Sequence, residues 1–124
     1  MIKVAVVRGK YLNNFEMQSY PIKTKEISLT GISSYFPIHT SFSFRVHRLP
    51  SISDISSLPL IRLFPINRGI QYISNRVIGD SQILFGLEKY ADMFDLFHTA
   101  DPHYYYSYQL AQLRKENKIK KFLS

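Results

Sequence analysis

The sequence predicts a single α/β domain built on an open, mostly parallel sheet flanked by helices. Its 124 residues suit one domain, and a hydrophobic share of 45% is enough for one buried core. The run Ile2–Val7 is apolar and rich in β-branched residues, which is typical of a strand buried on both faces. The second half of the chain alternates strand and helix patterns, and this alternation builds parallel sheets.

The first half contains two more predicted strands. Glu26–Ser33 carries apolar residues typical of a strand, and Phe42–Leu49 alternates apolar with polar residues until Pro50 closes it. Between the first two strands, a short helix is expected to begin at Asn13 or Asn14, because Asn is a good N-cap, and to end at Pro21.

The middle of the chain, Ser51–Gln82, has the poorest pattern, and within it only Ile61–Phe64 and Arg68–Ile78 favour helix. The signal improves from Leu84 onward, where the hydrophobic spacing predicts further elements in a regular order. They are an amphipathic helix over Leu84–Phe94, a short buried strand over Asp95–Ala100, a helix from Pro102 to Asn117, and the beginning of another strand at Ile119–Ser124. That last strand has no room to finish, which predicts a chain cut short at its C-terminal end.

The composition excludes several classes of site. The chain has no cysteine, so it has no disulfide, no thiolate zinc site and no cysteine nucleophile, and nothing points to an oxidising compartment. The start, Met1–Arg8, is too short and too soon charged for a signal peptide, and no run is long enough to span a bilayer. These features fit a cytoplasmic protein, with any membrane contact peripheral and at the inner face.

The formal charge of +7 favours a polyanionic partner, which leaves nucleic acid, anionic lipid headgroups and sugar phosphates open. The densest basic run lies at the end of the last predicted helix, where cations also suit the helix dipole, so a solvated face explains it equally well. The run comprises Arg114, Lys115, Lys118, Lys120 and Lys121.

The loop after the first strand is a candidate binding site, because open α/β sheets bind ligands at the carboxyl ends of their strands. It holds one glycine, Gly9, so it is neither a dinucleotide fingerprint nor a phosphate-cradling loop. The candidate contacts to a sugar or a lipid headgroup are Gly9, Lys10, Asn14 and Glu16. The alternative is that Gly9 only permits a tight turn.

A second candidate site follows the strand Asp95–Ala100, where His98, Asp101 and His103 come close together. Two imidazoles and a carboxylate suit acid–base work or a sugar hydroxyl, whereas their spacing matches no metal-ligand pattern. His98 and Asp101 are the candidate catalytic residues, and His103 is a candidate substrate contact. The alternatives are that Asp101 caps the following helix and that His98 is a satisfied buried histidine.

Four tyrosines, Tyr104, Tyr105, Tyr106 and Tyr108, mark the start of that helix. Such rings stack on bases or sugars, but helical spacing sends Tyr106 toward the core beside Leu110, and packing explains most of the cluster.

A family resemblance rests on Met1–Arg8, on the loop Gly9–Tyr20, and above all on Phe85–Tyr90 leading into Asp95–Pro102. Together they resemble the N-terminal domain of GT-B glycosyltransferases of family 4, group 1 type. The resemblance implies two Rossmann-like domains facing across a cleft, with the acceptor on the first and a nucleotide-sugar donor on the second. It also implies transfer of a sugar, with retention, to a lipid, glycan or small-molecule acceptor, without a metal or other cofactor.

The segment Asp95–Pro102 looks like the family's pattern of an aspartate, two hydrophobic residues, His-x-His, an acidic residue and Pro. Ala100 stands where that pattern has its second histidine, which leaves Asp101 and His98 to do any acid–base work. Gly9 matches the loop after the first strand, although the glycine-rich turn of many relatives is reduced to this one residue.

The resemblance also implies a second, donor-binding domain with an acidic E-x7-E motif, which residues 1–124 do not contain. One wall of a cleft cannot orient both substrates, so the chain alone is expected to be inactive. The rival hypothesis is a basic, non-enzymatic module that binds nucleic acid or an anionic membrane surface. The transferase hypothesis, which needs no specific nucleic acid, is preferred because the order of the elements supports it.

Overall fold

The computed structural model describes residues 1–14, 25–57, 69, 72 and 82–124. The predicted short helix near Asn14, the candidate residue Glu16 and the helix-favouring segment Ile61–Phe64 therefore lie wholly or largely outside the described residues, as does all of Arg68–Ile78 except Gly69 and Tyr72. The described elements, in chain order, are β1 (Ile2–Gly9), β2 (Ile27–Ser34), β3 (Arg45–Leu49), α2 (Ile52–Ser57), the 3-10 helix η1 (Leu87–Tyr90), β4 (Leu96–His98), α5 (Tyr105–Lys115) and β5 (Phe122–Leu123).

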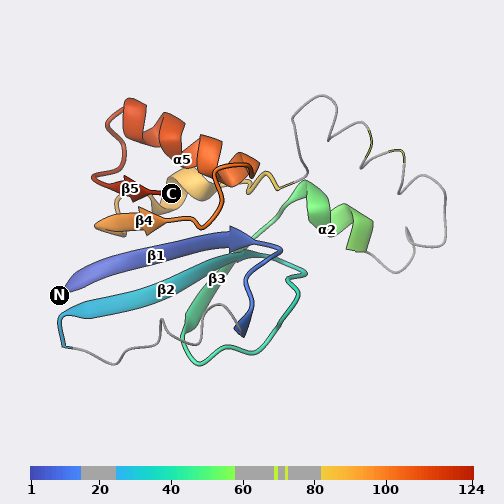
Figure 1. The fold of residues 1–124 in the computed structure, drawn as a ribbon, viewed down its shortest axis with the longest axis horizontal. Helices are drawn as coiled ribbons and strands as arrows, with labels where there is room; N and C mark the ends of the chain where they lie inside the picture. Colours follow the sequence, from blue (N-terminus) through green and yellow to red (C-terminus); the bar gives the residue numbers. More distant parts are fainter. Residues whose placement is uncertain (15–24, 58–68, 70–71, 73–81) are drawn as a thin grey trace.

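The described strands form one five-stranded sheet in the order β3-β2-β1-β4-β5, and every pair in it is parallel (Figure 1). This confirms the predicted α/β class with a parallel sheet. Val4 of β1 lies between Leu29 of β2 and Leu96 of β4. The strand order therefore runs outward from β1 to β3 and then restarts on the other side of β1 with β4.

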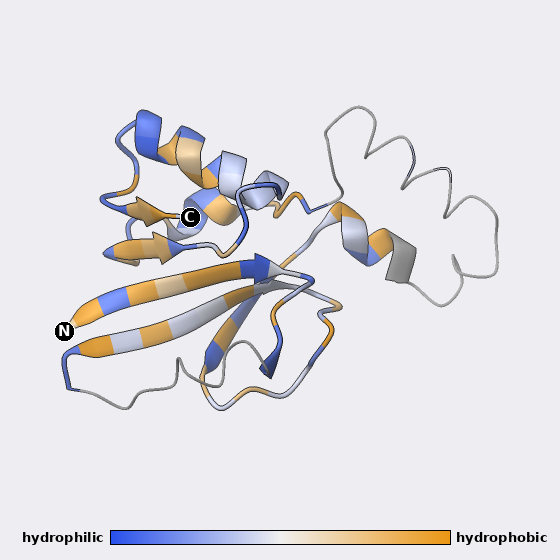
Figure 2. Ribbon diagram, in the orientation of Figure 1, coloured by the Kyte–Doolittle hydropathy of each residue, from blue (hydrophilic) through white to orange (hydrophobic). Residues whose placement is uncertain are grey.

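The central strand β1 is buried on both faces, which explains its continuous apolar sequence. Ala5 and Val7 belong to the main core cluster, whereas Val6 joins a smaller cluster with Leu12 on the other face. Alternation of side chains along a strand produces this division. Figure 2 shows the apolar residues along β1 and a hydrophilic tip at its carboxyl end.

The main core lies between the sheet and α5, which covers one face (Figure 1). Tyr106, Leu110 and Leu113 are buried there, as their helical spacing predicts. The helix begins at Tyr105 instead of Pro102. It ends in a Schellman motif, because Asn117 has φ 57° and the N–H of Lys118 donates to the carbonyl of Leu113 at 2.8 Å.

The second core cluster holds β3 and the residues before it. Phe42, Phe44 and Val46 pack there in alternation, as predicted, although the strand begins at Arg45 instead of Phe42. A Cβ at Gly31 would lie 2.9 Å from the Phe44 ring and 3.0 Å from Leu12, so the phenylalanine can approach β2 only because residue 31 is glycine.

The predicted helix over Leu84–Phe94 is wrong. Only Leu87–Tyr90 is helical, and it is a short 3-10 helix. Gly86 precedes it with φ 87°, a left-handed conformation that cannot continue an α-helix, and Leu84 forms an antiparallel bridge with Ser51. The apolar residues of the pattern are nevertheless buried, because tight turns bring them to the same core: Leu84, Leu87, Ala91 and Phe94.

The strand expected after Ile119 forms as the two-residue β5, which pairs with β4 through Phe97 and Phe122 and through His98 and Leu123. Strand β4 itself spans Leu96–His98, the centre of the predicted Asp95–Ala100.

Candidate functional site

The carboxyl ends of β1 and β4 form the natural place for a ligand in this sheet. The chain leaves these two neighbouring strands in different directions, because β1 leads to β2 on one side and β4 leads to β5 on the other. Loops diverge at such a switch point and leave a crevice for a ligand. Both predicted sites, the loop after β1 and the segment after β4, begin at this edge.

The loop after β1 makes a tight turn at Gly9, whose φ is 52°. A Cβ on this residue would lie 2.8 Å from Oε1 of Gln82 and 3.3 Å from the ring of Tyr106. The backbone N–H of Lys10 donates to the same Gln82 oxygen at 3.2 Å. The glycine therefore does what the tight-turn interpretation requires, and it also lets a buried glutamine side chain bind the loop.

Aromatic rings join the loop after β1 to the segment after β4. The ring of Tyr11 stacks on that of Tyr104, with centroids 4.9 Å apart, and Tyr104 lies 5.5 Å from the buried ring of Tyr106. Burial, followed by the neighbouring Tyr11, raises the pKa of Tyr104, so its hydroxyl stays protonated and can donate a hydrogen bond. The charge of Asp101 raises the same pKa further, and that of Arg8 opposes the shift.

His98 is the last residue of β4 and is partly buried. Burial, and to a lesser extent the positive charge of Arg8, lower the pKa of its imidazole. The ring is therefore neutral at physiological pH and offers one nitrogen as donor and one as acceptor. A neutral imidazole beside a cation suits recognition of a hydroxyl or the acceptance of its proton.

Asp101 does not cap α5, so the alternative interpretation of this residue is wrong. The N-cap of α5 is Tyr104, and no side chain caps the helix. The backbone of Asp101 is fixed instead, because its carbonyl accepts a hydrogen bond from Ser107 Oγ at 2.7 Å. Ser107 Oγ also hydrogen-bonds Thr99 Oγ1 at 2.9 Å. Two buried hydroxyls thus hold the backbone on either side of Ala100, while the Asp101 side chain is partly exposed at the edge of the sheet.

Asn14 does not join this group. The backbone N–H of Asn14 donates to Nδ1 of His39 at 2.9 Å, and its side-chain amide donates to the carbonyl of Ser41 at 2.8 Å, so Asn14 binds the loop after β2. His103 is exposed in the turn before α5. The structure therefore ties Gly9 and the backbone N–H of Lys10 to Gln82, while the Lys10 carbonyl accepts the N–H of Ile38 and Asn14 binds the loop after β2.

Sequence reasoning missed Asp54, which organises the same edge of the sheet beyond β2 and β3. Its carboxylate accepts backbone hydrogen bonds from Tyr35 at 3.1 Å, from Phe36 at 3.0 Å and from Ser51 at 2.9 Å. The bond from Ser51, together with Ser53 N–H donating to Ser51 Oγ at 3.4 Å, caps the start of α2 in a variant of the capping box. The spacing Ser51-x-x-Asp54 carries that signal in the sequence.

Two adjoining hollows lie beside this network. The first, of about 540 Å³, is lined by residues of the loops after β1 and β2 together with Arg48. The second, of about 620 Å³, is lined by Tyr35, by the end of β3 with Pro50, and by residues between Phe85 and Tyr90. Tyr35 and Arg48 line both, so these two side chains stand between them.

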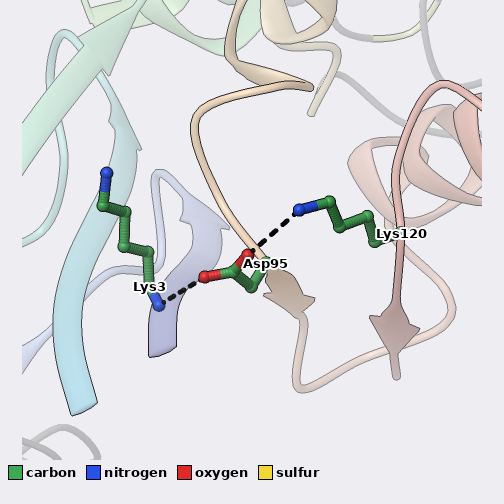
Figure 3. Close-up of polar contacts among 3 residues, drawn as sticks. All are labelled: Lys3, Asp95 and Lys120. Atoms are coloured by element: carbon green, nitrogen blue, oxygen red, sulfur yellow. Dashed lines mark hydrogen bonds and ion pairs between the residues drawn. The ribbon is translucent and has the colours of Figure 1, made fainter. Parts of the chain in front are cut away.

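Asp95, the first residue of the resemblance pattern, lies at the opposite, amino end of β4 (Figure 3). One carboxylate oxygen accepts the backbone N–H of Lys3 at 2.9 Å, and the other pairs with Lys120 Nζ at 3.3 Å. The Lys3 N–H, then Lys120, lower the pKa of this carboxyl group. Asp95 therefore links β1 with the segment that precedes β5 and does not contribute to the site.

Comparison with protein-family models, with curated proteins and with solved structures finds no match to this chain. Across the described residues, no group of three or more His, Asp or Glu side chains could hold a metal ion. The described helices include none long and apolar enough to cross a membrane.

Proposed function

We propose that this chain forms the acceptor-side domain of a retaining glycosyltransferase, which transfers a sugar from a nucleotide-sugar donor to a lipid, glycan or small-molecule acceptor. The observation that carries the proposal is the position of His98 and Asp101. His98 ends β4 and Asp101 follows that strand, at the switch point of a parallel sheet whose central strand β1 ends in the tight turn at Gly9.

The chemistry of this edge supports an acceptor hydroxyl as the ligand. The neutral imidazole of His98 can accept the hydroxyl hydrogen bond, and the Asp101 carboxylate can orient the same group or take its proton. The stacked rings of Tyr11 and Tyr104 offer an apolar platform of the kind on which sugar rings pack. Ala100, exposed between the two candidate catalytic residues, supplies no proton-transfer group of its own.

The donor side rests on the family resemblance. In the proposal the nucleotide sugar is held mainly by a second domain, and its phosphates approach the tight turn at Gly9. Transfer requires both walls of the cleft, so residues 1–124 alone bind the acceptor without turning it over.

The test is calorimetric titration of the product of the complete reading frame with nucleotide sugars, followed by a transfer assay on the donor that binds. The proposal expects donor binding and transfer. Asp101→Asn and His98→Ala should each lower the transfer rate by about 100-fold or more with donor affinity unchanged, since general acid–base groups contribute about that much. Asp92→Asn, on the exposed turn before β4, is the matched control and should leave the rate unchanged.

Absence of binding to any nucleotide sugar would overturn the proposal. If the same protein instead bound arbitrary oligonucleotides with a steep salt dependence, the basic binding module would take its place, because counterion release governs such binding.

A further inference from the structure

The loop between β2 and β3 exposes a short apolar surface. Tyr35 is 50% exposed, Phe36 44% and Ile38 55%, while Pro37 between them is buried. Three large apolar residues within four positions thus leave 44–55% of their area exposed. Such clustering marks an interaction surface more often than singly scattered exposed residues do.

Hydrogen bonds hold this loop in place at both ends. The Asp54 carboxylate accepts the backbone N–H groups of Tyr35 and Phe36, and the N–H of Ile38 donates to the carbonyl of Lys10 at 2.9 Å. The apolar side chains are therefore presented outward by an ordered backbone. Because the backbone holds these side chains outward before binding, less conformational entropy is lost when a partner binds.

Positive charge borders the apolar side chains. Lys10 and Arg48 line the same hollow of about 540 Å³ as Tyr35, Phe36 and Ile38, and no carboxylate belongs to its described lining. Arg48 is kept beside the loop, because its Nη2 donates to the carbonyl of Thr40 at 3.2 Å. Asp54 is buried beneath the loop and engaged with three N–H donors, and Glu88, which lines the adjoining hollow with Arg48, is accompanied there by Lys89.

We propose that the loop 35–38, with Lys10 and Arg48, is a docking surface for an anionic lipid bilayer. Phe36 and Ile38 would enter the boundary between headgroups and acyl chains, Tyr35 would lie at headgroup level, and the two cations would contact lipid phosphates. The net charge of +7 adds a long-range attraction to such a surface.

The residue types favour a bilayer over other partners. Nucleic acid would use aromatic rings and cations but would gain nothing from an exposed isoleucine. A free phosphate would leave the apolar side chains in water. A second copy of the chain, docked through the same surface, would bring Lys10 and Arg48 of both copies together, and like charges at an interface oppose association.

This inference goes beyond the proposed transferase function and stands without it. If both hold, the acceptor is carried by the membrane, since the docking loop and the candidate acceptor site share the carboxyl edge of the sheet.

The absence of tryptophan makes a direct test possible, because a single introduced indole is the sole fluorophore of its kind. Phe36→Trp places it in the docking loop, and Met93→Trp places it at a site of similar exposure, 48%, outside the loop. With vesicles containing roughly one third anionic phospholipid, the emission of Phe36→Trp should shift to the blue. Met93→Trp should not shift, and neither variant should respond to vesicles of neutral lipid.

Vesicle co-sedimentation supplies the second measurement. Arg48→Gln should weaken binding to anionic vesicles about fivefold, as expected for one cation at a membrane surface, and Phe36→Ser with Ile38→Ser by tenfold or more. The controls are Arg114→Gln with Lys115→Gln for charge and Met93→Ser with Tyr108→Ser for apolar exposure. Circular dichroism confirms that each variant is folded.

The proposal fails if the loop variants bind vesicles as well as the unmodified protein, or if the control variants lose as much binding as the loop variants. It also fails if the Phe36→Trp emission shifts with protein concentration in the absence of lipid, because the loop would then be a contact between copies. If the product of the complete reading frame binds anionic vesicles but has no transferase activity, the proposed function is contradicted and the docking surface still stands.

Discussion

The side-chain oxygen of Gln82 lies in the space that a Cβ on Gly9 would need. Its Oε1 lies 2.8 Å from the position of a Cβ on Gly9 and accepts the N–H of Lys10 at 3.2 Å. The last residue of β1 and a residue from far along the chain therefore fix each other at the edge where we place the candidate site.

Replacing Gly9 with alanine should destabilise the fold by about 1–3 kcal/mol, because φ is 52° and the new methyl group would collide with Gln82 and Tyr106. Urea unfolding followed by circular dichroism measures the change. Gly69→Ala is the control, since no described atom lies within 4 Å of the position its Cβ would take. Equal stability of the two variants would contradict the close approach.

Asp54→Ala should cost about 2–3 kcal/mol of unfolding free energy, since it removes a helix cap and leaves three backbone donors without their carboxylate acceptor. Thermal or urea denaturation measures it, and Asp92→Ala, on an exposed turn, should change stability by less than about 0.5 kcal/mol. Because Asp54 anchors Tyr35 and Phe36, amide exchange in the loop after β2 should also accelerate. Unchanged exchange there would show that the loop is held by other contacts.

Asp95 should make stability sensitive to acid. Its pKa is lower in the folded protein than in the unfolded chain, so its stabilising effect is complete above the ordinary aspartate pKa of about 4 and is lost as pH falls through the lower, folded value. A series of melting temperatures from neutral to acidic pH measures this loss. Asp95→Asn should flatten that part of the curve, and Lys120→Gln should reduce its slope. If the melting temperature of Asp95→Asn falls at acidic pH as much as that of the unmodified protein, the prediction is refuted.

His98 should titrate at lower pH than an ordinary histidine, because burial and Arg8 disfavour its charged form. The sign follows from linkage: as pH falls below the ordinary histidine value near 6.5, the unfolded chain takes up a proton that folded His98 does not, so stability decreases until the folded pKa is passed. NMR titration of the histidine ring signals measures this pKa, and the His98 signal is identified by its absence from the spectrum of His98→Gln. A His98 signal that titrates at or above the ordinary value would contradict the described burial.

Periodic patterns in the sequence predicted much of this fold. The central strand β1 and the buried face of α5 follow from local spacing, because a doubly buried strand and an amphipathic helix each leave a continuous signature. Leu84–Phe94 has the same signature but is not an α-helix, since Gly86 adopts a positive φ and Leu84 bridges to Ser51. The spacing predicted which residues are buried there and could not reveal the backbone that buries them.

The candidate site was predictable to a similar extent. Because the carboxyl ends of parallel strands meet at one edge of a sheet, Gly9, His98 and Asp101 could be placed at that edge from the sequence. Contacts between distant segments, such as Asn14 with His39 and Lys10 with Gln82, have no local signature and could not be inferred. The capping-box spacing of Ser51 and Asp54 was visible, but its extension to Tyr35 and Phe36 depends on how two loops meet.

The position of β1 at the centre of the sheet constrains the order of events during synthesis. Val4 is synthesised well before its partner Leu96 on β4. Until then one edge of an apolar strand has no neighbour in the sheet, and closing so long a loop is slow. The other edge of β1 is covered sooner, because its partner β2 is synthesised before β4.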